Sequence, residues 1–90
     1  MSKTVLCPAG TPTLLIRNIA ARGRARTFVV RLSHGVGGSV EVRSGPLPFF
    51  LGASRQMLAL SDGLTVHRGF FDASFEVIVS ADQDVNVRLD

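Results

Sequence analysis

The chain has 90 residues, of which 46% are hydrophobic and 19% are charged, and its formal net charge is +3. This length supports one domain with one core and leaves little room for a deep, enclosed active site. The charged fraction lies below the ~25% of an average soluble domain, which indicates either apolar surface covered by a partner or a generous core. The single cysteine, Cys7, excludes an intramolecular disulfide scaffold.

No apolar run approaches the roughly 18 residues of a transmembrane helix, so no membrane contact is predicted. The first residues, Met1–Pro8, lack the apolar core of a signal peptide. We therefore expect a protein that is made in the cytoplasm and is either used there or released by lysis.

Charge is distributed unevenly along the chain. Residues 1–45 carry seven basic residues and one acidic residue, a net charge of +6, whereas residues 46–90 carry three basic and six acidic residues, a net charge of −3. The two halves are electrically complementary, so they could fold against one another in a monomer. In an oligomer, the basic part of one copy could meet the acidic part of the next.

The N-terminal segment, residues 1–12, is polar and contains Pro8 and Pro12. Prolines keep a segment off central strands, so the pattern predicts an extended N-terminal arm with a short edge strand at Thr4–Leu6. Such arms are often ordered by a neighbouring molecule. The folded domain is predicted to occupy residues 13–90.

Short runs of alternating apolar residues follow one another through the rest of the chain, separated by turns rich in glycine, proline and aspartate. Such runs are typical of β-strands, and no stretch of helical periodicity reaches three turns. The pattern predicts a single small all-β sandwich, Ig-like or jelly-roll-like, with about seven to eight antiparallel strands. The predicted strands are Thr13–Ile19, Thr27–Ser33, Ser39–Arg43, Gln56–Leu60, Leu64–Arg68, Phe75–Val79 and Val85–Leu89.

Two β-hairpins are predicted from turn residues between neighbouring strands. The pair Asp62-Gly63 is a strong turn signal and indicates a hairpin of Gln56–Leu60 with Leu64–Arg68. The segment Phe75–Asp90 has the best-patterned pair of apolar runs, and we interpret it as a terminal hairpin that organises the sheet.

The spacing Asp82-x-Asp84-x-Asn86 resembles the opening of a calcium-binding loop. Such a loop needs glycine at its sixth position, where this chain has Val87. The pattern therefore favours a solvated turn, and no metal site is predicted.

No candidate nucleophile is paired with a base in the sequence. The run Gly35–Gly38 precedes a predicted strand, whereas a phosphate-binding loop precedes a helix. His34 and His67 lack further ligands at zinc-binding spacing. We therefore predict a non-enzymatic protein without a cofactor.

Five arginines fall within the fifteen residues from Arg17 to Arg31, and this segment is the strongest functional candidate. Arginines could bind phosphates, but nucleic-acid platforms on β folds usually add exposed aromatic residues, and the chain has no Tyr or Trp. A basic face that docks on another protein is favoured over nucleic-acid binding, and a merely solvated loop is an equal alternative. The candidate interface residues are Arg17, Arg22, Arg24 and Arg26.

Two pairs of adjacent phenylalanines lie in turn-rich segments, Phe49-Phe50 and Phe70-Phe71. Adjacent residues of an extended chain point in opposite directions, so both members of a pair cannot easily enter the same core. At least one of each pair is therefore a candidate interface anchor, and all four are candidate interface residues.

From Arg26 onward the features follow a recognisable order. A basic residue precedes an apolar strand, then come a short β-branched strand that ends near glycine, a Pro/Leu/Gly loop, a short strand pair and a closing hairpin. The positions are Arg26 with Phe28–Leu32, Ser39–Gly45, Pro48–Gly52, Gln56–Leu60, and Phe75–Val79 with Val85–Leu89. This order resembles small β-sandwich modules of tailed-bacteriophage virions, such as head decoration and head-fibre base proteins.

The resemblance implies a non-enzymatic structural protein of a phage particle, made in the host cytoplasm and located in the virion. It implies a homo-oligomer that binds the major capsid protein or another virion protein. One alternative is an adhesion or carbohydrate-binding sandwich, and the absence of Tyr and Trp as sugar platforms counts against it. The other alternative is nucleic-acid binding through the basic segment Arg17–Arg31.

Overall fold

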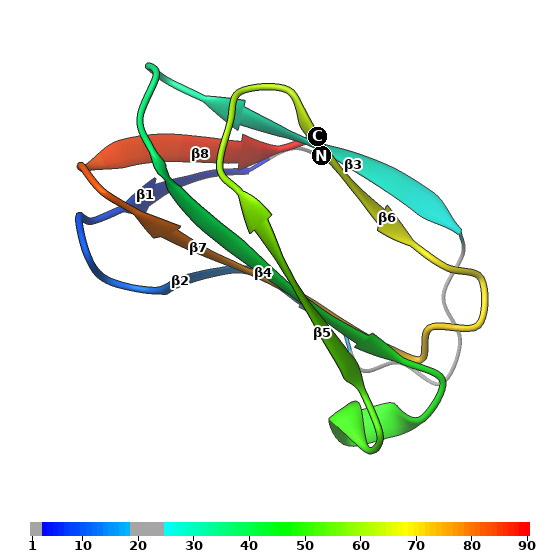
Figure 1. Ribbon diagram of the computed structural model, residues 1–90. Helices are drawn as coiled ribbons and strands as arrows, with labels where there is room; N and C mark the ends of the chain where they lie inside the picture. Colours follow the sequence, from blue (N-terminus) through cyan, green and yellow to red (C-terminus); the bar gives the residue numbers. More distant parts are fainter. Residues whose placement is uncertain (1–2, 19–24) are drawn as a thin grey trace.

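The computed structural model describes residues 3–18 and 25–90. The described residues form eight β-strands and one short 3-10 turn, η1 (Pro48–Phe50) (Figure 1). They form no α-helix. The strands are β1 (Thr4–Cys7), β2 (Thr13–Asn18), β3 (Arg26–Leu32), β4 (Gly38–Gly45), β5 (Ser54–Ala59), β6 (Leu64–Arg68), β7 (Ser74–Ala81) and β8 (Val85–Leu89).

The strands form two four-stranded antiparallel sheets, in the orders β1-β8-β3-β6 and β2-β7-β4-β5. The two sheets face one another as the layers of a sandwich (Figure 1). The all-β class, the two-layer architecture and the number of strands are thus as the sequence predicts.

The connectivity follows a single rule. β1 pairs with β8, β2 with β7, β3 with β6 and β4 with β5. The chain is therefore one long antiparallel ribbon that doubles back between β4 and β5. Rolling this ribbon brings β8 against β3 and β7 against β4. This is the connectivity of a jelly roll.

The two predicted hairpins are wrong, because the strands of each lie in different sheets. β5 and β6 are separated by a link that crosses the sandwich, in which Gly63 N–H donates to the Val30 carbonyl oxygen at 2.7 Å. Between β7 and β8, Asp82 N–H donates to the Gly37 carbonyl oxygen at 2.9 Å rather than closing a hairpin turn. Alternation determines which face of a strand is buried, but it does not determine the strand's partner.

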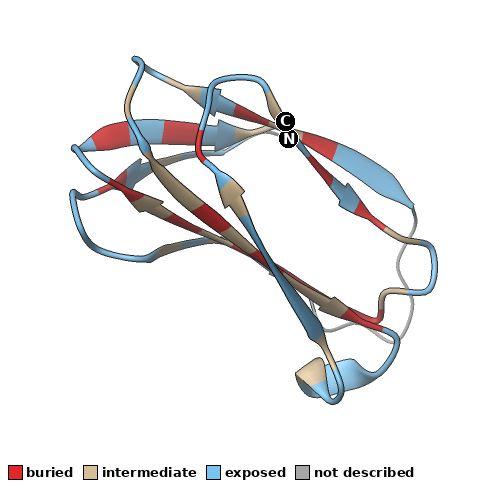
Figure 2. Ribbon diagram, viewed as in Figure 1, coloured by how far each residue is buried: buried red, intermediate tan, exposed pale blue. Residues whose placement is uncertain are grey.

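The core lies between the sheets and is built from the inward residues of both (Figure 2). Phe28 of β3 and Phe75 of β7 stack across the sandwich with ring centroids 5.6 Å apart, so the two layers meet through aromatic contact. The buried core residues are Cys7, Phe28, Val30, Val40, Val42, Leu60, Val66, Phe75, Val77, Val79, Ala81, Val85 and Val87.

The predicted N-terminal arm contributes a strand to this core. The edge strand expected at Thr4–Leu6 is present as β1, and Cys7 at its end is fully buried. After the strand, Gly10 N–H donates to the Ala81 carbonyl oxygen at 2.8 Å. The described part of the arm is therefore attached to the sandwich over most of its length.

Burial raises the pKa of the Cys7 thiol, and a hydrogen bond to Thr13 partly offsets this rise. Because the native pKa lies above that of the unfolded chain, the protonated thiol contributes stability below the unfolded pKa of about 8.5. This contribution is lost as the pH rises through the native pKa. We expect the unfolding free energy measured in urea to fall between pH 7 and pH 10, and to fall less in Cys7→Ala. An equal fall in both proteins would contradict the assignment.

Candidate protein-binding surface

Two loops lie at one end of the sandwich (Figure 1). Both present apolar side chains to solvent. They are the β4–β5 loop, residues 46–53, and the β6–β7 loop, residues 69–73. Five of the eight large hydrophobic residues that are exposed in the described chain belong to these loops. We call this set the apolar tip: Leu47, Phe49, Leu51, Phe70 and Phe71.

The β4–β5 loop holds two phenylalanines in an unfavourable backbone conformation. Phe49 and Phe50 both have φ of 58°, in the left-handed region that side chains other than glycine rarely adopt. Each such residue costs about 1–2 kcal/mol, and backbone strain of this kind concentrates at functional sites. The fully buried hydroxyl of Ser74 stabilises the loop: Ser74 Oγ accepts from Phe50 N–H at 2.9 Å and donates to the Leu47 carbonyl oxygen at 2.7 Å.

An ion-pair cluster supports the same loop from the outer face of the β2-β7-β4-β5 sheet. Glu76 of β7 is fully buried between two arginines that lie opposite it in the strand register. Glu76 Oε2 lies 2.6 Å from Arg17 Nε, and Oε1 lies 3.1 Å from Arg43 Nη1. The Arg43 guanidinium also lies 4.8 Å from the centroid of the Phe50 ring. Phe50 is thereby held against the sheet, while Phe49 stays 70% exposed.

The β6–β7 loop presents its phenylalanines from a tight turn. Asp72 N–H donates to the Gly69 carbonyl oxygen at 3.2 Å, and Gly69 N–H donates to Asp72 Oδ2 at 2.8 Å. The guanidinium of the buried Arg68 donates to the Asp72 carbonyl oxygen at 2.8 Å. Phe70 and Phe71 occupy the central turn positions, which usually carry small or polar residues. They are 59% and 80% exposed.

The candidate arginines have different surroundings. Arg17 is paired with Glu76, and Arg26 is exposed at the start of β3, with its guanidinium 4.5 Å from the centroid of the Phe28 ring. Arg22 and Arg24 lie outside the described residues. Arg17 and Arg26 thus belong to different sheets of the sandwich.

The interface residues predicted from the sequence do not include Leu47, Leu51 or Glu76, although Leu51 belongs to the loop Pro48–Leu51, which is predicted to contact a partner. The two leucines flank Phe49-Phe50 in the same loop. The feature of the sequence that could have indicated them is the apolar character of this Pro/Gly-rich segment. Burial of Glu76 has no local signal, because its partners Arg17 and Arg43 lie on other strands.

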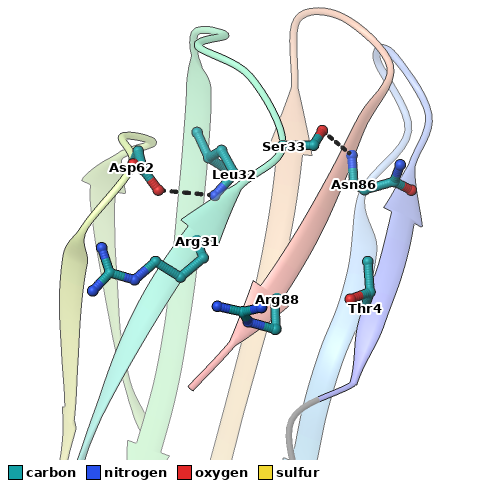
Figure 3. Close-up of a pocket in the computed structure, with 7 residues that line it drawn as sticks. All are labelled: Thr4, Arg31, Leu32, Ser33, Asp62, Asn86 and Arg88. Atoms are coloured by element: carbon teal, nitrogen blue, oxygen red, sulfur yellow. Dashed lines mark hydrogen bonds between the residues drawn. The ribbon is translucent and has the colours of Figure 1, made fainter.

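A second feature is a polar pocket of about 330 Å³ on the outer face of the β1-β8-β3-β6 sheet (Figure 3). Its polar groups are partly engaged by neighbours: Asp62 Oδ1 accepts from Leu32 N–H at 3.0 Å, and Ser33 Oγ accepts from Asn86 N–H at 3.1 Å. Arg88 Nε lies 2.8 Å from Asp90 Oδ1. The lining residues are Thr4, Arg31, Leu32, Ser33, Asp62, Asn86 and Arg88.

Within residues 3–18 and 25–90, no three His, Cys, Asp or Glu side chains are grouped so as to hold a metal ion. Asp84, from the calcium-like spacing, instead accepts a hydrogen bond from Ala9 N–H at 2.7 Å. The same described ranges contain no helix that is long and apolar enough to cross a membrane.

No family model, no curated protein and no solved structure matches this chain.

Proposed function

We propose that this protein is a non-enzymatic structural module of a phage particle that binds the capsid or another virion protein through its apolar tip. One observation carries the proposal: two structured loops hold Phe49, Phe70 and Phe71 in solvent at one end of the sandwich. Exposed aromatic side chains on an ordered support are typical anchors of protein–protein interfaces.

The backbone strain in the β4–β5 loop supports the same conclusion. A sequence under no functional demand would relieve the left-handed conformation at Phe49 and Phe50 with glycine or asparagine. The loop instead places bulky aromatic residues there and stabilises them with Ser74 and Arg43. The strain is therefore explained if the exposed ring of Phe49 contributes binding energy.

The fold supports the virion role by analogy alone. Eight-stranded jelly rolls are used in virus capsids, but they also occur in lectins and in unrelated proteins, so the fold does not determine the function. The analogy agrees with the phage modules that the order of the strands and loops resembles.

The proposal is tested by adding purified protein to shells assembled from the major capsid protein of the same virus and measuring co-sedimentation. We expect binding, and we expect Phe71→Asp or Phe49→Asp to weaken it by about 30-fold or more, as for an anchor worth about 2 kcal/mol. Because both side chains are exposed, the melting temperature should change little.

Leu6→Asp is the matched control, because Leu6 is an exposed apolar residue on β1, outside the apolar tip. This variant should bind as tightly as the unmodified protein. The proposal fails if the folded protein does not bind shells, or if the tip variants and the Leu6 control bind equally well.

The polar pocket of Figure 3 favours one alternative, a carbohydrate-binding module. Hydroxyl, amide, carboxylate and guanidinium groups hydrogen-bond sugars, although this pocket lacks an aromatic platform. Binding of a glycan that is lost in Asn86→Ala and retained in Phe71→Asp would replace the virion proposal with this one.

A further inference from the structure

Four strands stand at the edges of the two sheets, and three of them carry features that discourage pairing with another chain. β1 has four residues and is followed by Pro8. β2 has a register shift between Leu14 and Ile16, and β6 turns the charged side chain of Arg68 into the interior. Short length, irregular register and inward charge are the usual means by which natural sheets protect their edges.

β5 has none of these features. Its six residues pair with β4 in an unbroken register, and it contains no proline and no buried charge. Five of the six are exposed, as the pale blue colour along the strand shows (Figure 2). Its one charged residue, Arg55, is paired with Glu41 of β4 at 3.2 Å, which directs the guanidinium over the sheet face.

The backbone groups that β5 leaves free follow from its ladder with β4. Leu60 N–H donates to the Gly38 carbonyl oxygen at 3.0 Å, and the direction of bonding alternates along an antiparallel edge strand. Gln56 and Leu58 therefore bond toward β4. Arg55, Met57 and Ala59 alternate with these two residues along the strand. Their N–H and C=O groups therefore point away from β4, to the open edge of the sheet.

One register lets a second copy use all three of these residues. A two-fold axis at Met57 pairs this residue with its own equivalent and pairs Arg55 with Ala59 of the second copy. Like charges directly opposite one another would destabilise the pair, and this register places none in that position. Met57 is 53% exposed on the outer face of the sheet, so its side chain would be covered by the equivalent methionine.

We infer that two copies of this chain pair in antiparallel orientation along β5. The two β2-β7-β4-β5 sheets then become one continuous eight-stranded sheet through a closed, two-fold contact. This inference deepens the self-association in the proposed function and rests on it, and it adds the location and register of the contact.

The sharpest test is Met57→Pro. Proline removes the N–H at the centre of the proposed pair, and this group does not take part in the β4 ladder, so an edge strand tolerates the change. We expect light scattering to give twice the monomer mass for the unmodified protein and a dissociation constant at least about 10-fold higher for Met57→Pro. Gln56→Pro is the control for which backbone groups face the open edge. Because the Gln56 N–H bonds to β4, this variant breaks the β4 ladder and should lower the melting temperature.

A pair of charge variants tests the register without proline. Ala59→Glu places a carboxylate opposite Arg55 of the second copy and should tighten the dimer, whereas Ala59→Arg places like charges opposite one another and should weaken it. A monomeric unmodified protein at high concentration, an unchanged dimer in Met57→Pro, or equal effects of the two Ala59 variants would each overturn the inference.

The outcomes separate this contact from the virion role. A Met57→Pro monomer that still co-sediments with shells supports the β5 contact and leaves binding through the apolar tip intact. A dimer that forms through β5 but does not bind shells supports the β5 contact and defeats the proposed virion role.

Discussion

Deleting residues 1–12 is expected to abolish cooperative unfolding. The deletion removes β1, its ladder with β8 and the buried Cys7 side chain, and it uncovers Val85 and Val87 in the core. A small domain is stable by only about 5–15 kcal/mol, so the loss of an entire strand removes most or all of this margin. Circular dichroism during heating should show no cooperative transition for the shortened chain.

Leu6→Ser provides the control for this deletion. Leu6 is exposed on the outer face of β1, so its replacement should change the free energy of unfolding by no more than about 0.5 kcal/mol. If the shortened chain melts cooperatively near the temperature of the full chain, β1 is dispensable and this account of the N-terminal segment is wrong.

Replacing both Arg17 and Arg43 by methionine is expected to lower the free energy of unfolding by about 3 kcal/mol or more. Methionine keeps the apolar stems that cover Glu76 but removes both positive charges, which leaves a buried carboxylate without a counter-charge. Denaturation in urea measures this loss as a lower midpoint at unchanged slope.

Adding Glu76→Gln to this double variant distinguishes a charge effect from a packing effect. The amide has nearly the same shape and no charge, so the triple variant should regain at least half of the lost stability. If the triple variant is no more stable than the double variant, lost packing rather than an unpaired charge explains the result.

The positions of the strands could be predicted from the sequence because alternation reports burial directly. Leu64–Arg68 is predicted with the bounds of β6, and Val85–Leu89 with the bounds of β8. The pairing of strands could not be predicted in the same way. In a jelly roll most neighbours in sequence lie in opposite sheets, so a good turn pair such as Asp62-Gly63 marks a crossing rather than a hairpin.

The candidate site could be predicted in part. The structure describes all four candidate phenylalanines, and none of them belongs to the core. Phe50 differs from the others because it is partly covered by Arg43, a contact between β4 and the following loop that depends on a left-handed backbone. A phenylalanine in the sequence does not indicate a left-handed backbone, whereas a glycine at the same position would have indicated one.

The pairing of β1 with β8 has a consequence for how this protein is made. The ribbon must bring β1 against β8, which follows the other seven described strands in the chain, so the β1-β8-β3-β6 sheet cannot be completed until residues 85–89 have been synthesised. Synthesis proceeds at about 5–20 residues per second, and contacts this distant in sequence also form slowly once the chain is released. The nascent chain therefore exposes the apolar face of β3 for seconds before β7 and β8 are made, and we expect its folding to be sensitive to chaperones that bind unpaired strands.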